Sequence, residues 1–209
     1  MTDIIIVKFG QKEIEDNCIS SVLRSTSSPY HLTIFDNFIK KENLARVWNK
    51  LIRQSDSEYI CLLNSDTMVT KDWLENLLEA FDQDPLLGVV GPSTNKCGNQ
   101  QCKAPPREPS LYPFIDFGRT YPNWCLSGFC ILFPKNVWEE VGGFPEDCGF
   151  YGQEVAFIDK LTTRGYKQCW RTDTFVFHYG GYTARKTFNQ EQLKEERAKG
   201  NAYIKETRK

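Results

Sequence analysis

The chain has 209 residues, of which 25% are charged and 13% aromatic, and its formal net charge is -1. A chain of this length can bury one hydrophobic core without dividing, so we expect a single domain over residues 1–209. The aromatic content excludes a disordered chain, the apolar runs are too short for stable membrane insertion, and the net charge gives no general attraction to nucleic acid.

Residues 1–3 lead directly into a continuous apolar run, residues 4–7, without the basic start and long apolar stretch of a signal peptide. We therefore expect a cytoplasmic protein. An unbroken apolar run of this kind is typical of a parallel strand that is buried on both faces.

After this run, helical and strand-like segments alternate along the chain. Amphipathic helices are expected at residues 14–22, 44–52, 73–81, 135–141 and 154–164, and a highly charged helix at about 190–208. Strands are expected at residues 32–35, 59–63, 87–90 and 126–133, and a further strand ends at His178. This alternation predicts an α/β fold, a three-layer sandwich with a mostly parallel central sheet.

One long segment, residues 93–123, departs from the alternation. It is polar and rich in proline, and it has no clear hydrophobic period. Loops of this length inside compact domains are usually binding segments or lids, or else disordered. We expect a long loop there.

The eight cysteines have no CxxC spacing. Three of them lie within apolar stretches and are expected to be small core residues: Cys18, Cys61 and Cys130. The pairs Cys97/Cys102 and Cys125/Cys130 each enclose four residues, so a zinc clip is an alternative. Buried or loop thiols in a reducing compartment are the favoured interpretation.

A polar and acidic triplet, Asn64-Ser65-Asp66, follows the third strand-like run. The carboxyl ends of strands in open α/β sheets are where ligand-binding groups gather. Two later features fall where they would complete such a site: Gly152-Gln153-Glu154 at the start of a helix, and His178 at the end of a strand. Together these residues suggest a metal–nucleotide site.

The order of these motifs resembles family-2 glycosyltransferases of the GT-A fold. The resemblance extends from residue 4 to about residue 181, and seven pieces carry it: Asp36-Asn37, Asn49, residues 63–67, residues 126–129, residues 141–144, residues 152–154 and His178. It implies a metal-dependent, inverting transfer of a sugar from a nucleotide-sugar donor, with a UDP-sugar favoured, to an acceptor hydroxyl group.

The resemblance implies that Asp66 binds a divalent cation, Mn²⁺ or Mg²⁺, and that His178 supplies a second ligand. Such a cation takes oxygen ligands and neutralises the charge that grows on a departing diphosphate. Asn64 stands where the family often has an aspartate, which departs from the pattern. The alternatives are a turn carboxylate for Asp66 and a structural histidine for His178.

The resemblance places the nucleotide donor against a second set of residues, in which the Asp36 carboxylate would accept a hydrogen bond from the base. The residues implied for donor binding are Phe9, Asp36, Asn37, Asn49, Asn64, Ser65 and Asp66. Asp36 can instead be a turn residue, and Asn49 can be a polar helix residue whose hydrogen bonds are satisfied within the protein.

Glu154 matches the position of the family's catalytic carboxylate and would act as the general base, with Gln153 beside it. On the acceptor side the resemblance adds Trp124, Ser127 and Gly128, because aromatic and small residues suit the face of a sugar. The alternatives are a helix-terminal carboxylate for Glu154 and a core residue for Trp124.

Three other functions are weighed against this one. A catalytically silent protein that keeps the fold and binds nucleotide sugars would explain Asn64 and Gln153. A sugar-phosphate nucleotidyltransferase or a dehydrogenase is disfavoured, because no glycine-rich phosphate loop follows the first strand. The sugar, the oligomeric state and the acceptor, which can be a glycan, a protein, a metabolite or a modified base, stay open.

Overall fold

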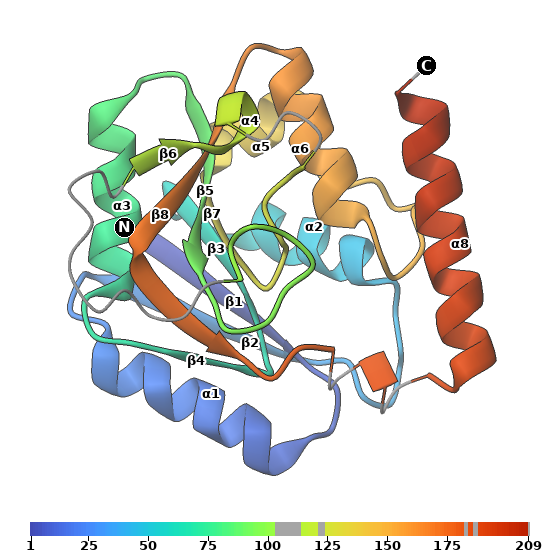
Figure 1. The fold of residues 1–209 in the computed structure, drawn as a ribbon. Helices are drawn as coiled ribbons and strands as arrows, with labels where there is room; N and C mark the ends of the chain where they lie inside the picture. The colour runs from blue at the N-terminus through green and yellow to red at the C-terminus, as the bar shows by residue number, and fades with distance from the viewer. Residues whose placement is uncertain (103–113, 121–123, 182–183, 186–187, 209) are drawn as a thin grey trace.

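The computed structural model describes residues 1–102, 114–120, 124–181, 184–185 and 188–208, and Figure 1 shows the arrangement of their helices and strands. The strands are β1 (Thr2–Lys8), β2 (Tyr30–Asp36), β3 (Tyr59–Asn64), β4 (Thr67–Val69), β5 (Leu87–Ser93), β6 (Phe114–Asp116), β7 (Cys130–Pro134) and β8 (Lys167–His178). The helices are α1 (Lys12–Ser25), α2 (Leu44–Gln54), α3 (Trp73–Gln83), α4 (Phe117–Thr120), α5 (Lys135–Val141), α6 (Gln153–Thr163) and α8 (Gln190–Thr207).

In the described part of the chain the strands form one sheet of eight, in the order β2-β1-β3-β7-β5-β8-β4, with β6 paired to β8. The pairs β1–β2, β1–β3 and β5–β8 are parallel, whereas β7 runs antiparallel between β3 and β5. Strands β1, β2, β3, β5 and β8 therefore all point the same way. The expected α/β sandwich with a mostly parallel sheet is confirmed.

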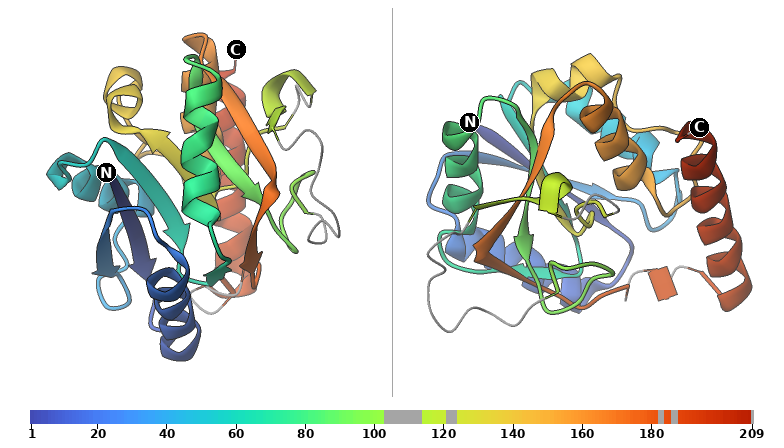
Figure 2. Two further views of the ribbon diagram at one scale, coloured as in Figure 1. Left: turned by 90° about the vertical axis from the view of Figure 1, so that its left-hand side faces the viewer. Right: turned by 45° about the horizontal axis from the view of Figure 1, so that its top comes forward.

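Helices cover both faces of the sheet, as Figure 2 shows from two sides. Strand β1 explains why: Ile4 and Ile6 enter one hydrophobic cluster, and Ile5 and Val7 enter the other. Helices α1 and α3 pack on the first face, and α2, α5 and α6 pack on the second. A strand that is apolar on both faces needs two helical layers, because each face must be removed from water.

Strand β7 is shorter than the sequence predicts, because it begins at Cys130 rather than at residue 126. Leu126 donates its backbone N–H to the Gln168 side chain, and the Phe129 carbonyl oxygen accepts from Asn64 N–H at 2.8 Å. The backbone N–H groups of Leu126 and Ser127 thus bond to side chains rather than to a strand, and the pairing with β3 ends at the Phe129 carbonyl oxygen. Ser127 and Gly128 therefore lie just before the first residue of β7, outside the sheet.

The expected loop at residues 93–123 contains more regular structure than its composition predicts. Strand β6 pairs with β8 and leads into the short helix α4, and an isolated bridge joins Thr94 to Cys102. The remainder of that prediction, residues 103–113 and 121–123, lies outside the described residues.

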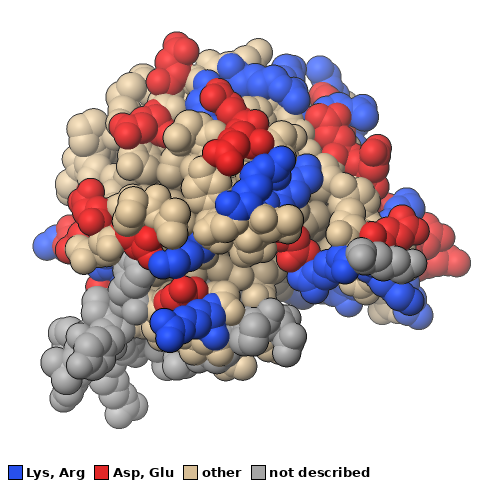
Figure 3. All heavy atoms as spheres, turned by 90° about the horizontal axis from the view of Figure 1, so that it is seen from above, with Lys and Arg blue, Asp and Glu red and all other residues tan. Residues whose placement is uncertain are grey.

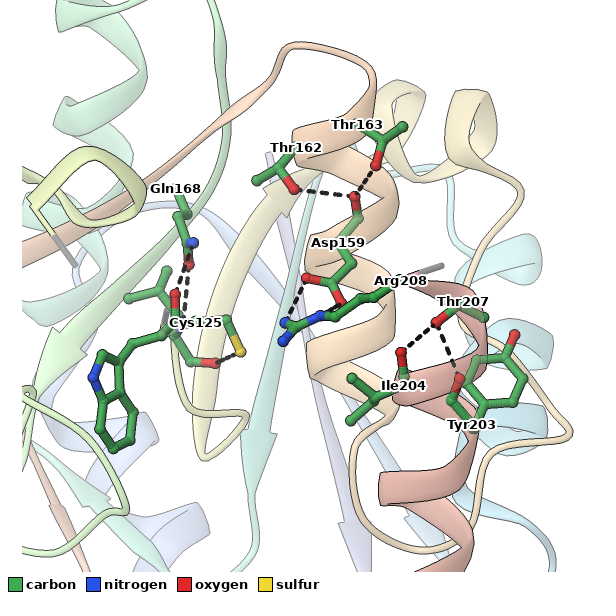
Figure 4. A network of polar contacts seen from close by, with 11 residues as sticks. Cys125, Asp159, Thr162, Thr163, Gln168, Tyr203, Ile204, Thr207 and Arg208 are labelled. Atoms are coloured by element: carbon green, nitrogen blue, oxygen red, sulfur yellow. Dashed lines mark hydrogen bonds and ion pairs between the residues drawn. The ribbon is translucent and has the colours of Figure 1, made fainter. Parts of the chain in front are cut away.

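Helix α8 packs closely on the segment that precedes α6. Gly200 is buried, and a Cβ atom on it would lie 2.1 Å from the Tyr151 carbonyl oxygen. The Glu196 carboxylate accepts the Phe150 backbone N–H at 2.6 Å. Near the end of the helix, Arg208 donates two hydrogen bonds to the Asp159 carboxylate of α6, at 2.7 and 2.9 Å (Figure 4).

Lysine and arginine side chains alternate with acidic side chains on the face seen in Figure 3, so that face carries no extended patch of one sign. None of the helices in the described part of the chain combines the length and apolar character needed to cross a membrane.

The Gly200 contact predicts an unusual response to an alanine substitution. Alanine favours a helix over glycine by about 1 kcal/mol, yet Gly200→Ala should lower the free energy of unfolding by about 1–3 kcal/mol, because its Cβ overlaps Tyr151. Asn201→Ala is the matched control, since residue 201 is exposed on the same helix and the change also raises helix propensity. Urea unfolding should give opposite signs for the two variants; stabilisation by both would refute the contact.

Candidate functional site

A cavity of about 460 Å³ lies where β1 and β3 end, with residues of the β7 entry, α6 and the end of β8 in its walls. This volume is in the range of small-molecule binding sites. The cavity is lined by Val7, Phe9, Leu44, Trp48, Leu63, Asn64, Ser65, Asp66, Gly98, Ser127, Gly128, Phe129, Phe150, Tyr151, Gln153, Glu154, His178, Gly181, Ala184 and Arg197.

Asp66 and His178 meet at one end of this cavity. Strand β4 pairs antiparallel with the end of β8, which sets Thr67 opposite His178, and Tyr179 N–H donates to the Asp66 carbonyl oxygen at 3.0 Å. The Asp66 Oδ1 atom is 3.3 Å from His178 Nε2. Both side chains are nearly buried, with 4% and 10% of their surfaces exposed.

The hydrogen bond on the other side of the imidazole ring determines where its protons lie. Nδ1 of His178 is 2.9 Å from the Lys96 carbonyl oxygen, which can only accept, so Nδ1 must carry the proton. In a neutral ring, Nε2 then points a lone pair at the Asp66 carboxylate. Two acceptors face each other favourably at this distance when a cation or a proton lies between them.

His178 is also held by its backbone and by its ring face. Its N–H donates to the Asn95 side-chain oxygen at 2.7 Å, and its carbonyl oxygen accepts from the Asn95 amide at 3.1 Å. The Phe129 ring stacks on the imidazole at 5.2 Å between centroids. Ligating histidines are usually oriented by such surrounding contacts, which fix the ring and its tautomer.

The donor set of Asp66 and His178 fits a divalent cation that is completed by other ligands. Carboxylate oxygen and imidazole nitrogen both bind such ions, and the Nδ1 proton leaves Nε2 free to ligate. Among the described residues, no group of three or more histidine, cysteine and acidic side chains could hold a metal. The remaining positions would therefore belong to a bound ligand and water.

The cysteines show no zinc clip in the described part of the chain. Cys18, Cys61 and Cys130 are fully buried in the core, as expected, and Cys130 lies beside Cys61 rather than with Cys97 and Cys102. Burial raises the pKa of the Cys97 thiol to about 11 and that of the Cys125 thiol further still. Neutral thiols bind zinc weakly, because the thiolate is the ligand.

Glu154 enters the cavity from the first turn of α6, and Gly128 makes room for it. A Cβ atom on Gly128 would lie 3.1–3.2 Å from the Glu154 side-chain carbons. Burial raises the pKa of the Glu154 carboxyl above its usual value, while the backbone N–H groups of Glu154, Gly128 and Gly152 partly oppose this. A carboxylate with a raised pKa is a stronger base, which suits proton abstraction.

Of the acceptor-side residues, the structure brings Gln153, Ser127 and Gly128 to the cavity and leaves Trp124 outside its wall. The Trp124 side chain is 46% exposed, so the core alternative is wrong, and its role on the acceptor side stays a prediction. The buried side chain of Gln153 makes no hydrogen bond within the described residues, and its Nε2 is completely enclosed.

The predicted donor residues separate into two groups. Phe9, Asn64, Ser65 and Asp66 line the cavity. Asp36 is exposed at the end of the edge strand β2 and accepts from Phe38 N–H, so it does not reach the cavity wall. Its role in binding the base stays a prediction.

The side chains of Asn37 and Asn49 are used within the protein and lie outside the cavity wall, and their contact with the donor stays a prediction. The buried Asn37 side chain exchanges two hydrogen bonds with the Glu42 backbone and closes a turn. Asn49 donates to the Phe144 carbonyl oxygen and to Glu146, and it accepts from Phe144 N–H. Its amide therefore anchors the segment after α5.

Two kinds of site residue carry no clear signal in the sequence. The buried Gln101 accepts from Ser127 N–H and Asn99 and donates to the Pro92 carbonyl oxygen, so it holds the cavity wall from behind. Tyr151, in the segment before α6, and Arg197, in α8, also line the cavity, and neither belongs to a sequence motif. The apolar residues Leu44 and Trp48 were predictable only as the inner face of α2.

The family model described as "Glycosyl transferase family 2" matches residues 37–142, half of the chain. The poly-beta-1,6-N-acetyl-D-glucosamine synthase of Staphylococcus aureus is 25% identical over 189 residues, which cover 81% of this chain and 45% of that protein. The chain thus spans less than half the length of the curated relatives it matches.

Solved structures share the fold at low sequence identity. S. aureus TarS 1–349 in complex with UDP-GlcNAc has a TM-score of 0.66 and 12% identity, covering 90% of this chain and 61% of that one. The mannosyltransferase PcManGT from Pyrobaculum calidifontis, in complex with GDP-Man and Mn²⁺, has a TM-score of 0.62 and 14% identity, covering 85% and 56%. These likenesses show the fold alone.

Proposed function

Because the chain belongs to glycosyl transferase family 2, we propose that it transfers a sugar from a nucleotide-sugar donor to an acceptor hydroxyl group, with a divalent cation and with inversion at the anomeric carbon. A nucleotide sugar accords with the UDP-GlcNAc and GDP-Man complexes of the structural relatives. We favour UDP as the nucleotide, as the sequence resemblance implies.

The observation that carries this proposal is the opposition of Asp66 Oδ1 and His178 Nε2 at 3.3 Å. With Nδ1 of His178 committed to the Lys96 carbonyl oxygen, the pair is arranged to hold Mn²⁺ or Mg²⁺. Such a cation, when bound, neutralises negative charge on a departing diphosphate. Asn64 and Ser65 line the same wall and are placed to contact the donor.

Glu154 is the proposed general base. It is the carboxylate that the cavity presents at the start of α6, which lies apart from the paired ends of β4 and β8 in Figure 1. A base there would take the proton of the acceptor hydroxyl as its oxygen attacks the anomeric carbon opposite the leaving diphosphate. A single displacement of this kind inverts the configuration. Ser127, Gly128 and Gln153 would border the reacting sugar.

A second candidate, a silent nucleotide-sugar-binding protein, shares the Asp66–His178 pair but has no need of a base with a raised pKa. Hydrolysis of the donor, measured with and without Mn²⁺, separates the two functions, because a silent protein would bind the donor and leave it intact.

Asp66→Asn tests the binding half of the proposal. Losing the anionic ligand should weaken Mn²⁺-dependent binding of UDP-sugars by at least about tenfold in calorimetry, because even indirect disturbance of a metal site costs that much. Asp16→Asn, on the exposed surface of α1, removes the same charge and should bind like wild type. Equal donor affinity in wild type and Asp66→Asn at every Mn²⁺ concentration would rule out the metal role.

Glu154→Gln tests the catalytic half. Donor affinity should stay within about twofold of wild type, and turnover should fall by roughly 10²- to 10⁴-fold, the usual contribution of a positioned base. Retention of more than about a tenth of wild-type turnover would exclude Glu154 as the base.

The raised pKa of Glu154 gives the same variant two pH-dependent signatures. The base works when deprotonated, so wild-type kcat should fall as the pH drops through a midpoint above 4.5, and the variant should lose that limb. A folded-state pKa above the unfolded value means that stability declines as the pH rises past the unfolded value. Glu154→Gln should therefore unfold at a higher temperature than wild type at pH 7.

A further inference from the structure

Helix α8 brings an exposed arginine, Arg197, to the wall of the cavity. Its docking rests on backbone contacts, with Gly200 against the Tyr151 carbonyl oxygen and the Glu196 carboxylate on Phe150 N–H. Arg197 lies between these two contact points in the sequence, and its guanidinium carbon is 5.1 Å from the centre of the Tyr151 ring. The arginine is therefore held by a packed helix and an aromatic face.

Arg197 has no anionic partner in the described part of the chain. Arg46, Arg171 and Arg208 each pair with a carboxylate, whereas Arg197 forms none of the ion pairs found there. Among the described residues that line the cavity, it is the sole lysine or arginine. A guanidinium offers five donors in a planar fork that matches the oxygens of phosphate and carboxylate groups.

The position of Arg197 relates it to the acceptor rather than to the donor diphosphate. Figure 1 shows α8 along the right-hand side of the molecule, apart from the β4–β8 pair at its lower centre, where Asp66 and His178 lie. Tyr151, on which Arg197 stacks, leads within three residues to Glu154. An acceptor must bring its hydroxyl group to Glu154, so its neighbouring groups pass beside Tyr151.

Gln153 extends the same wall. Its buried side-chain amide has no hydrogen-bond partner within the described residues, and the residue lines the cavity. Because its Nε2 atom is enclosed, the amide does not itself donate to a group in the cavity. Its side chain is neutral, so this part of the wall adds no negative charge that would repel an anionic group.

We propose that Arg197 binds an anionic group of the acceptor, a phosphate or a carboxylate. The proposal rests on the proposed function and narrows its acceptor to a negatively charged class. The guanidinium group can bind phosphate and carboxylate in the same way, so the test includes one probe of each class.

The test measures binding of matched probes to the full chain saturated with UDP and Mn²⁺, or with the nucleotide that the donor experiment identifies. Glycerol 3-phosphate is compared with glycerol, and glucuronate with glucose, by calorimetry. Wild type should bind at least one anionic probe at least about tenfold more tightly than its neutral counterpart. Arg197→Gln should lose about 10- to 100-fold for that probe, the loss expected when one or two charge-assisted hydrogen bonds are removed.

Three comparisons make the result specific. Lys194→Gln removes one positive charge from the exposed surface of α8 and should bind the probes like wild type. Arg197→Lys keeps the positive charge but lacks the planar guanidinium group, so its affinity for the anionic probe should lie between those of wild type and Arg197→Gln. Donor affinity in Arg197→Gln should stay within about twofold of wild type.

Several results would overturn the proposal: no preference of wild type for either anionic probe, equal binding by wild type and Arg197→Gln, or a loss of donor affinity in Arg197→Gln, which would assign the arginine to the diphosphate. The titrations are repeated without nucleotide. A wild-type protein that binds no nucleotide would refute the proposed function, and that failure is visible independently of the anion titrations.

Discussion

The candidate site depends on one short antiparallel pairing, between β4 and the end of β8. It joins a turn near residue 66 to a strand end near residue 178 and sets two acceptor atoms, Asp66 Oδ1 and His178 Nε2, 3.3 Å apart. The arrangement is unfavourable for a neutral histidine, because its one N–H group, at Nδ1, already donates to the Lys96 carbonyl oxygen. It becomes favourable when a positive charge lies between the two side chains.

The same constraint explains why the surroundings of the site are so thoroughly hydrogen-bonded. Asn95 holds the His178 backbone from both sides, Gln101 holds the wall at Ser127, and Asn64 N–H is tied to the Phe129 carbonyl oxygen. Buried polar groups are costly unless they are paired, and two groups of the cavity carry such a cost: the Gln153 amide lacks a partner within the described residues, and burial raises the pKa of the Glu154 carboxyl. Their cost to stability is the usual sign of groups kept for a ligand or for catalysis.

The sequence predicted most of the fold and the polar core of the site. Buried strands that end in polar residues, as at Asn64 to Asp66 and at His178, mark the edge of an α/β sheet where ligands bind. The structure brings these residues together around the cavity. The prediction was wrong where a local contact uses the backbone, since β7 begins four residues late because Leu126 bonds to Gln168. The side chains of Asn37 and Asn49 bond within the protein, and their contact with the donor stays a prediction.

The part played by α8 was beyond prediction from sequence, because it depends on tertiary packing. Its composition reads as a solvated charged helix, and neither Gly200 nor Arg197 belongs to a motif. Only the structure shows that a backbone contact at Gly200 places one of many arginines in the cavity wall.

Pulsed electron paramagnetic resonance of Mn²⁺ bound together with UDP tests the central claim most directly. If the opposed pair holds the metal ion, the wild-type spectrum will contain the coupling of an imidazole nitrogen to Mn²⁺. The His178→Ala variant will lose this coupling, although it still binds Mn²⁺ with a lower affinity than wild type. His31, the other histidine of the chain, is exposed on β2 and serves as a control, so His31→Ala should keep the coupling. A wild-type Mn²⁺–UDP complex without any nitrogen coupling would contradict the account.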